Sequence, residues 1–255
     1  MWLFRLVVVG VLIMARGAPD DSNVKVGKDL YRLDDLAELA VRLGSIVNYN
    51  RYGSVLMLDG FEEGMNAWNK NTTGVAAEVV VSDAMAYNGQ VSLKVDSGTG
   101  VTPYAGISKY LPPVTECRMG MQSTFNLNDD VESILFYMTY GKAPTRWYFI
   151  VRYEHATGEL QYGSAPGVYT AFATPGALYD GSNNWHNLKM IVDLTTGEYV
   201  RCSLDNAVYD MSGFVPDTGA WAAGPFLLPI LRVYGSLATE GIVYFDNVIV
   251  TYNEF

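Results

Sequence analysis

The segment that decides the fold is WHNLKMIVDLTTGEYVRCSLDNAVYD, residues 185–210. Apolar residues recur at every second position over 188–194, which is typical of a strand with one buried face. A turn signal follows at 195–197, and the same alternation returns over 200–204. The pair Asp-Asn at 205–206 favours a second reversal. The segment therefore predicts an antiparallel meander that serves as core scaffold and not as a reaction centre.

The composition favours strands over helices throughout the chain. Of 255 residues only 17% are charged and 13% are aromatic, with 18 tyrosines and 25 glycines. Helical proteins contain more Glu, Lys, Leu and Ala. The formal net charge of -10 and the lack of any basic run exclude nucleic acid as a partner, because phosphate contacts require clustered Lys and Arg.

Short alternating segments separated by turns continue through the rest of the chain. The expected strands are residues 75–82, 90–96, 105–110, 117–127, 132–140, 146–154, 159–163, 186–194, 198–204, 207–211, 227–234 and 242–252. Two of the reversals share Thr-Gly-Glu, at 157–159 and at 196–198. Many short strands without interleaved helices predict an all-β fold, a two-sheet antiparallel jelly-roll sandwich over residues 59–255.

The N-terminal part has a different character. Residues 1–19 hold a short apolar run that fits a secretory signal peptide, an over-extended reading frame before Met14, or an apolar arm packed on a neighbouring subunit. Residues 20–58 predict an attachment segment. Within it, 35–44 has capping-box spacing and one apolar helical face, and 45–58 forms a hairpin. The alternative is that this helix closes one end of the sandwich.

The two cysteines, Cys117 and Cys202, lie in segments whose alternation points both side chains inward. They form a disulfide if the protein is secreted, or they remain two buried thiols that pack as small apolar groups. Two cysteines and two histidines at these spacings give no zinc signature.

Three segments carry a family resemblance: LDGFEEGMNAW at 58–68, the central segment at 185–213, and VYFDNVIVTY at 243–252. Together they resemble the concanavalin A-like and laminin G-like jelly rolls and the carbohydrate-binding modules of the same architecture. The resemblance covers residues 58–254 and implies that the first and last strands pair. This architecture hosts lectins, glycosidases, adhesins and virion proteins. The arm, helix and hairpin before the sandwich, residues 20–58, also resemble structural proteins of tailed phages.

The sequence lacks the pattern expected of a catalytic jelly roll. Glycosidases need two carboxyl groups that face each other across a groove, and catalytic members of this group carry a Glu-x-Asp-x-x-Glu strand that is missing here. Glu154 and Glu159 flank a turn, and neither His155 nor His186 belongs to a recognisable triad. We therefore expect no enzyme.

Hard oxygen ligands gather where the resemblance brings the first and last strands together. Asp59, Glu62 and Asp246 are candidates for a structural calcium site, since calcium takes carboxylate and carbonyl oxygens. In the alternative, Asp246 and Asn247 accept backbone hydrogen bonds at a strand bulge and Glu62 is solvated. No other cofactor is expected.

Aromatic side chains supply the candidates for a contact surface. Alternation over 146–154 turns Tyr148 and Arg152 towards solvent, and the long segment 162–184 carries further aromatics among Gly, Pro and Ala. That segment is either a contact surface or an apolar flap over the sheet. The candidate contacts for a glycan or a partner are Tyr148, Arg152, Tyr162, Tyr169, Phe172 and Tyr179.

These features lead first to a non-catalytic structural protein on a virion or envelope surface, a capsid-decoration or tail-associated protein that forms homo-oligomers and contacts glycans. The alternative is a secreted carbohydrate-binding module or lectin. A glycoside hydrolase of the concanavalin A-like fold comes third. Each of the three predicts a virion or extracellular location.

Overall fold

A computed structural model describes residues 53–254 except 66, 113, 115, 129, 182 and 183. The helix expected at 35–44, the first arm of the hairpin at 45–58 and the apolar segment at 1–19 lie outside the described residues.

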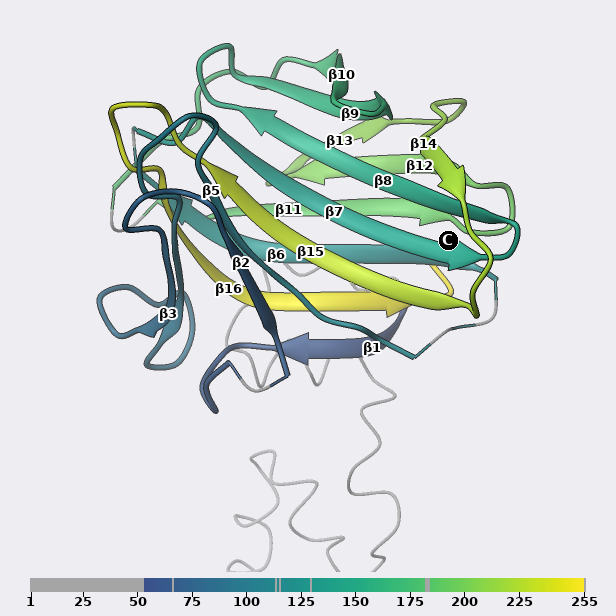
Figure 1. Ribbon diagram of the computed structural model, residues 1–255, viewed down its shortest axis with the longest axis horizontal. Coiled ribbons are helices and arrows are strands. Elements are labelled where there is room, and N and C mark those ends of the chain that lie inside the picture. Colours follow the sequence, from purple (N-terminus) through teal and green to yellow (C-terminus); the bar gives the residue numbers. More distant parts are fainter. Residues whose placement is uncertain are drawn as a thin grey trace, which may run out of the picture.

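The named strands of the described part form two antiparallel sheets stacked face to face (Figure 1). Sheet A has the order β13 (Ala207–Asp210), β12 (Glu198–Leu204), β11 (His186–Asp193), β6 (Arg118–Leu127), β16 (Ile242–Tyr252), β4 (Ser92–Asp96) and β3 (Glu78–Ser82), with β1 (Ser54–Asp59) also on β16. Sheet B has the order β10 (Val168–Ala173), β9 (Glu159–Ala165), β8 (Thr145–Glu154), β7 (Ser133–Lys142), β15 (Phe226–Tyr234), β5 (Tyr104–Ser108) and β2 (Asn69–Thr72), with β14 (Asp217–Ala220) also on β8. The two-sheet sandwich is confirmed.

The expected strands are present, and three short ones are added. β2, β10 and β14 were not predicted because they lack a clean alternation of apolar residues; β2, for example, reads NKNT and is exposed along its whole length. Within the described residues the structure contains no helix, and therefore no helical segment with the length and apolarity of a membrane span.

The segment at 185–210 occupies the interior of sheet A. β11 pairs with β12 on one side and with β6 on the other, so both of its edges are covered. The two Thr-Gly-Glu reversals place Gly158 and Gly197 at φ 65° and 74°, a left-handed conformation that favours glycine. The antiparallel meander predicted for this segment is confirmed.

The opening and closing strands pair as the resemblance implied. β1 runs antiparallel to β16 with Asp59 opposite Val248, while β4 pairs with the earlier half of the same strand. β1 thus adds residues 54–58 to the sandwich, which the sequence analysis had begun at Asp59.

Aromatic rings join the two sheets at the centre of the core. Phe125 of β6 and Phe245 of β16 both contact Phe136 of β7, with ring centroids 5.9 and 6.3 Å apart. All three side chains are fully buried. Each fully buried aromatic side chain contributes several kcal/mol to the free energy of unfolding. Because this cluster spans both sheets, it stabilises their stacking.

Candidate functional site

The outer face of sheet B carries a set of tyrosines, and we call it the tyrosine face. Strand pairing places Arg232, Leu135 and Arg152 in one row across β15, β7 and β8. The next row contains Ile230, Tyr137 and Ile150. The rings of this face are Tyr104, Tyr137, Tyr148, Tyr169 and Tyr234.

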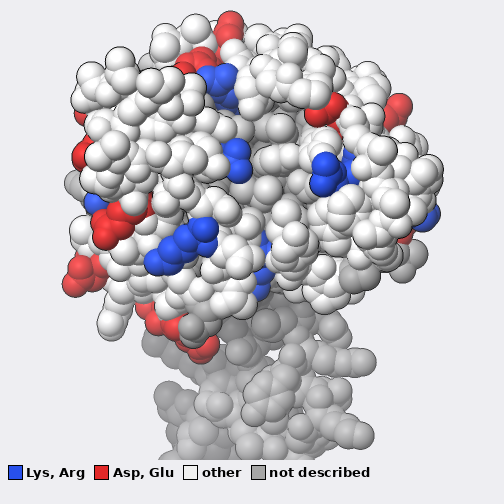
Figure 2. All heavy atoms as spheres, viewed as in Figure 1, with Lys and Arg blue, Asp and Glu red and all other residues white. Residues whose placement is uncertain are grey.

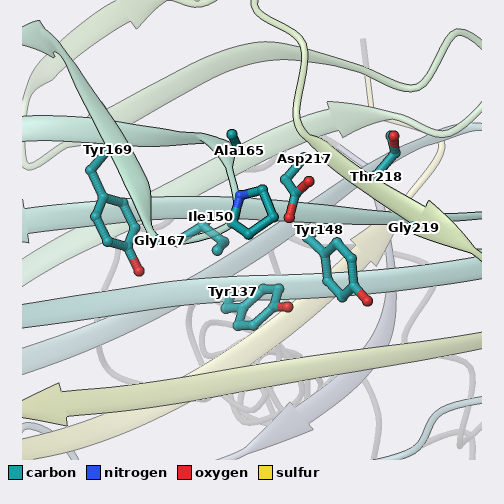
Figure 3. A pocket seen from close by; sticks show the side chains of 10 residues that line it. Tyr137, Tyr148, Ile150, Ala165, Gly167, Tyr169, Asp217, Thr218 and Gly219 are labelled. Carbon is teal, nitrogen blue, oxygen red and sulfur yellow. The ribbon is translucent and has the colours of Figure 1, made fainter.

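A cavity of about 420 Å³ opens on the tyrosine face. Its floor is formed by Tyr137, Tyr148 and Ile150 of β7 and β8. The β9–β10 turn at 165–167 and the strand β14 at 217–219 form its walls, and Tyr169 closes one end (Figure 3). The volume lies within the range of small-molecule sites, which run from about 300 to 1,000 Å³.

Two of the cavity tyrosines, Tyr137 and Tyr169, present neutral phenol groups. The rings of Tyr137 and Tyr148 lie 6.1 Å apart, between centroids, in a tilted arrangement. Burial raises the pKa of Tyr137 and of Tyr169 above the usual value, so both hydroxyl groups stay protonated at neutral pH. A protonated hydroxyl both donates and accepts hydrogen bonds, as a sugar hydroxyl does.

Arginines are interleaved with these rings. Arg146 lies over Tyr148, Arg152 over Tyr169 and Arg232 over Tyr104, with 4.3 to 4.8 Å between the guanidinium carbon and the ring centroid. The space-filling view of this side is hollowed near its centre, with Lys and Arg atoms around the hollow (Figure 2). Buried polar atoms without a hydrogen-bond partner gather here: Nε of Arg146, Arg152 and Arg232, Oγ of Ser133 and Oε1 of Gln161.

Three of the six candidate contact residues lie together on this face. Tyr148 and Tyr169 line the cavity, and Arg152 stacks on Tyr169. Phe149 and Val151 of the same strand point into the core, as the alternation over 146–154 predicted.

The other three candidates lie elsewhere. Tyr162 faces the core, stacked on Phe214 at 4.6 Å between centroids, and Phe172 also contacts Phe214, at 6.2 Å. Tyr162 lies in β9 and Phe172 lies in β10, so the segment at 162–184 is not one long loop. Tyr179 is exposed but does not line the cavity.

Sequence reasoning missed Arg232 and the β14 wall. Leu227, Leu231 and Val233 are fully buried, and this alternation along β15 turns Arg232 to the outer face. That signal is readable in the sequence. By contrast, Asp217 and Thr218 lie in a short strand whose pairing with β8 no local pattern indicates.

The calcium candidates do not assemble into one ligand set. Asp59 accepts hydrogen bonds from the indole of Trp68 and the backbone of Phe61, and Glu62 accepts them from the backbone at 90–91. Asp246 accepts the backbone N–H groups of residues 87, 88 and 247, at the bulge in β16. Burial outweighs these bonds and raises the pKa of Asp246 to about 6. In the described part of the chain no three His, Cys, Asp or Glu residues are grouped to hold a metal ion. The arrangement matches the alternative drawn from the sequence for Asp246.

The disulfide considered from the sequence is not formed. Cys117 and Cys202 are both free, and Cys202 is fully buried. Cys117 directly precedes β6, and Cys202 lies in β12. Because β11 lies between these two strands, about 10 Å separates the segments that carry the two cysteines, which is too far for a disulfide. Of the two thiols that the alternative expected to be buried, Cys202 is buried and Cys117 is half-buried.

Comparison with known proteins supports the fold. No protein-family model matches the chain, and no curated protein matches its sequence. The chain is similar to the solved structure of "Cellulose induced protein, Cip1", with a TM-score of 0.53 and 13% identity over 76% of this chain and 96% of that one. The TM-score is lower for two further structures. A Bacillus licheniformis beta-glucanase has a TM-score of 0.46 and 10% identity over 78% of this chain and 98% of that one. A xylan-binding domain from Paenibacillus barcinonensis has a TM-score of 0.40 and 16% identity over 81% of this chain and 99% of that one. The described domain therefore has the fold of a two-sheet jelly-roll sandwich.

Proposed function

We propose that this domain is a non-catalytic glycan-binding module that holds a polysaccharide along the tyrosine face. The observation that carries the proposal is the set of tyrosine rings beside the cavity of about 420 Å³. Sugars are recognised by stacking of their apolar faces on aromatic rings, with polar side chains to bond the hydroxyl groups. Here Tyr148 and Tyr169 supply rings, and Asp217 and Thr218 supply polar groups at the wall.

The likeness to a protein named for induction by cellulose is in keeping with this function. A virion or extracellular surface, the location expected from the sequence, is where such a module would meet polysaccharides. The location is part of the proposal.

Two observations favour binding over hydrolysis. A glycosidase needs a pair of carboxyl groups about 5 to 10 Å apart across the bound sugar. Over the described residues, the two central strands β7 and β15 place no Asp or Glu on the tyrosine face, and Asp217 is the single carboxyl group that lines the cavity.

The assembly role that the sequence suggested first has less support. It rested on the N-terminal arm, the apolar loop segments and the low charge. Of these, the segment at 162–184 packs Tyr162 and Phe172 against the molecule's own core. Glycan binding requires no oligomer, and the cavity is built within one chain.

The test is a binding panel of neutral and acidic polysaccharides, read by affinity gel electrophoresis. The protein should be retarded by at least one polysaccharide, and Tyr148→Ala should weaken retardation about tenfold, since one lost stacking contact removes about 1–1.5 kcal/mol. Tyr244→Ala is the matched control, because Tyr244 lies on β16, where its neighbours Val243 and Phe245 point into the core, and so faces away from sheet B. Equal loss in both variants, or no retardation by any polysaccharide, contradicts the proposal. Release of reducing ends from the bound polysaccharide would show instead that the domain is a glycosidase.

A further inference from the structure

Among the described residues, two arginines of the tyrosine face have no acidic partner. Arg146 contacts the rings of Tyr148 and Trp221, and Arg232 contacts the ring of Tyr104 and donates to the hydroxyl of Tyr234. Within the described residues no carboxylate lies at ion-pair distance from either guanidinium group. Arg152 differs, because it pairs with Glu154 and Glu132 at the end of the sheet.

These two cations lie on either side of Tyr137. Strand pairing puts Arg232 two residues beyond Ile230, the partner of Tyr137 on β15, and puts Arg146 four residues before Ile150, its partner on β8. Burial raises the pKa of Tyr137, and the positive charges of Arg232 and Arg146 act in the opposite direction. Tyr137 is part of the cavity floor, so the two arginines lie on either side of that floor along the strands. The acidic groups that face this space are Asp217 at the wall, and Glu132 and Glu154, which are engaged with Arg152.

The local charge is opposite to that of the chain. The protein has a formal net charge of -10, and yet the outer face of sheet B carries arginines that lie over tyrosine rings. The Nε–H groups of Arg146 and Arg232 are buried without a hydrogen-bond acceptor. Holding partly desolvated cations without a counter-charge costs stability, and sites that bind anions commonly accept that cost.

We propose that the glycan bound on the tyrosine face is anionic, and that Arg232 and Arg146 receive its acidic groups beside Tyr137. The planar guanidinium group suits carboxylate and sulfate oxygens, which it can bind through two parallel hydrogen bonds. Tyrosine rings then stack on the sugar rings between the acidic groups. This inference rests on the proposed function and adds the charge class of the ligand.

The experiment compares acidic and neutral polysaccharides that share one sugar backbone. Polygalacturonate is set against its fully methyl-esterified form, and dextran sulfate against dextran, with affinities measured by isothermal titration calorimetry. At least one acidic form should bind about tenfold more tightly than its neutral counterpart, and this preference should shrink as NaCl rises from about 50 to about 500 mM. The polygalacturonate and dextran sulfate comparisons show whether the arginines bind carboxylate or sulfate groups.

Three variants localise the effect. Arg232→Gln and Arg146→Gln should each abolish most of the preference for the acidic form and leave the weaker affinity for the neutral form. Arg118→Gln is the matched control, because Arg118 lies on sheet A in an exposed pair with Asp193, and it should keep the preference. Thermal unfolding of each variant verifies folding.

The outcomes separate this inference from the function on which it rests. If acidic and neutral forms bind equally well, or if Arg118→Gln removes the preference as Arg232→Gln does, the charge inference is wrong and glycan binding stands. If neither member of any pair binds, and no polysaccharide in the wider panel binds, the proposed function itself fails.

Discussion

The guanidinium group of Arg152 lies over the ring of Tyr169, with 4.8 Å from its central carbon to the ring centroid. The contact joins β8 to β10, at opposite sides of β9, and so holds the outermost hairpin of sheet B against its centre. Tyr169 also closes one end of the cavity. One ring therefore serves both the shape of the sheet and the candidate binding site.

Replacement of this ring should affect binding through its face and not through its hydroxyl group. Tyr169→Ala should lower affinity for the bound polysaccharide about fivefold to tenfold, whereas Tyr169→Phe should stay within about twofold of the parent. Calorimetric titration of both variants decides this. A loss of equal size in Tyr169→Phe would mean that the phenol hydroxyl, and not stacking, carries the contact.

The ion pair between Lys189 and Glu254 predicts a stability effect on the opposite sheet. The Lys189 ammonium nitrogen lies 2.6 Å from Oε1 of Glu254, and both side chains are almost fully buried. Burial lowers the pKa of Lys189, and the Glu254 carboxylate opposes that change. Glu254→Gln removes the charge that compensates the ammonium group and should cost about 3 kcal/mol in the free energy of unfolding.

The exposed pair of Arg118 and Asp193 provides the comparison. Its arginine side chain is 45% exposed, so Arg118→Gln should change the free energy of unfolding by less than about 1 kcal/mol. Urea denaturation measures both variants. Similar costs for the two would show that the Lys189–Glu254 pair is not desolvated.

His186 should make stability depend on pH. Burial lowers the pKa of His186, but hydrogen bonds to the Asp205 carboxylate and the Tyr179 carbonyl outweigh burial and raise the pKa above its usual value. Both ring nitrogens face acceptors, so only the protonated ring donates to both. The stabilisation is fully present below the unfolded pKa of about 6.5 and is lost as pH rises through the higher folded pKa.

The measurement is the melting temperature between about pH 5.5 and 8.5. A loss of one hydrogen bond, worth about 1 kcal/mol, should lower Tm by about 2–4 °C across that window, and His186→Asn should flatten this part of the profile. An unchanged slope in His186→Asn would assign the pH dependence to other groups.

The aromatic cluster between the sheets should dominate stability. Phe136→Ala removes the ring that contacts both Phe125 and Phe245 and should cost about 3–5 kcal/mol. Leu237→Ala, at a side chain that is 70% exposed, should change stability by no more than about 0.5 kcal/mol. If Phe136→Ala costs less than about 1 kcal/mol, the stacking of the two sheets depends on other contacts.

Much of this structure could be predicted from alternation alone. The period of two in 186–194 and 146–154 gave both the strands and the faces of Phe149 and Arg152, because in a strand the side-chain direction follows from position. The pairing of β1 with β16 came from the resemblance. The polar strand β2 and the short strand β14 could not be predicted, since their partners, and not their residues, make them strands.

The candidate site was harder to predict, because it too depends on which strands pair and not on a local sequence pattern. Tyr162 was expected at the surface because its segment read as a loop, but its pairing in β9 turns it inward onto Phe214. The cavity itself joins β7, β8, β14 and the β9–β10 turn, and the sequence holds no local signal for that juxtaposition. The outward direction of Arg232 could have been predicted from the alternation of β15, and it would have indicated a positive charge at the site.

The most direct test of glycan binding on the tyrosine face is a titration of the ¹⁵N-labelled protein with the tightest-binding oligosaccharide, followed by NMR chemical shifts. The account predicts that the shifted backbone signals cluster on β7, β8, β14 and the β9–β10 turn, including those of Tyr137, Tyr148 and Gly167. Signals of Asn187 and Lys189 on sheet A should not move. Shifts confined to sheet A would contradict the account.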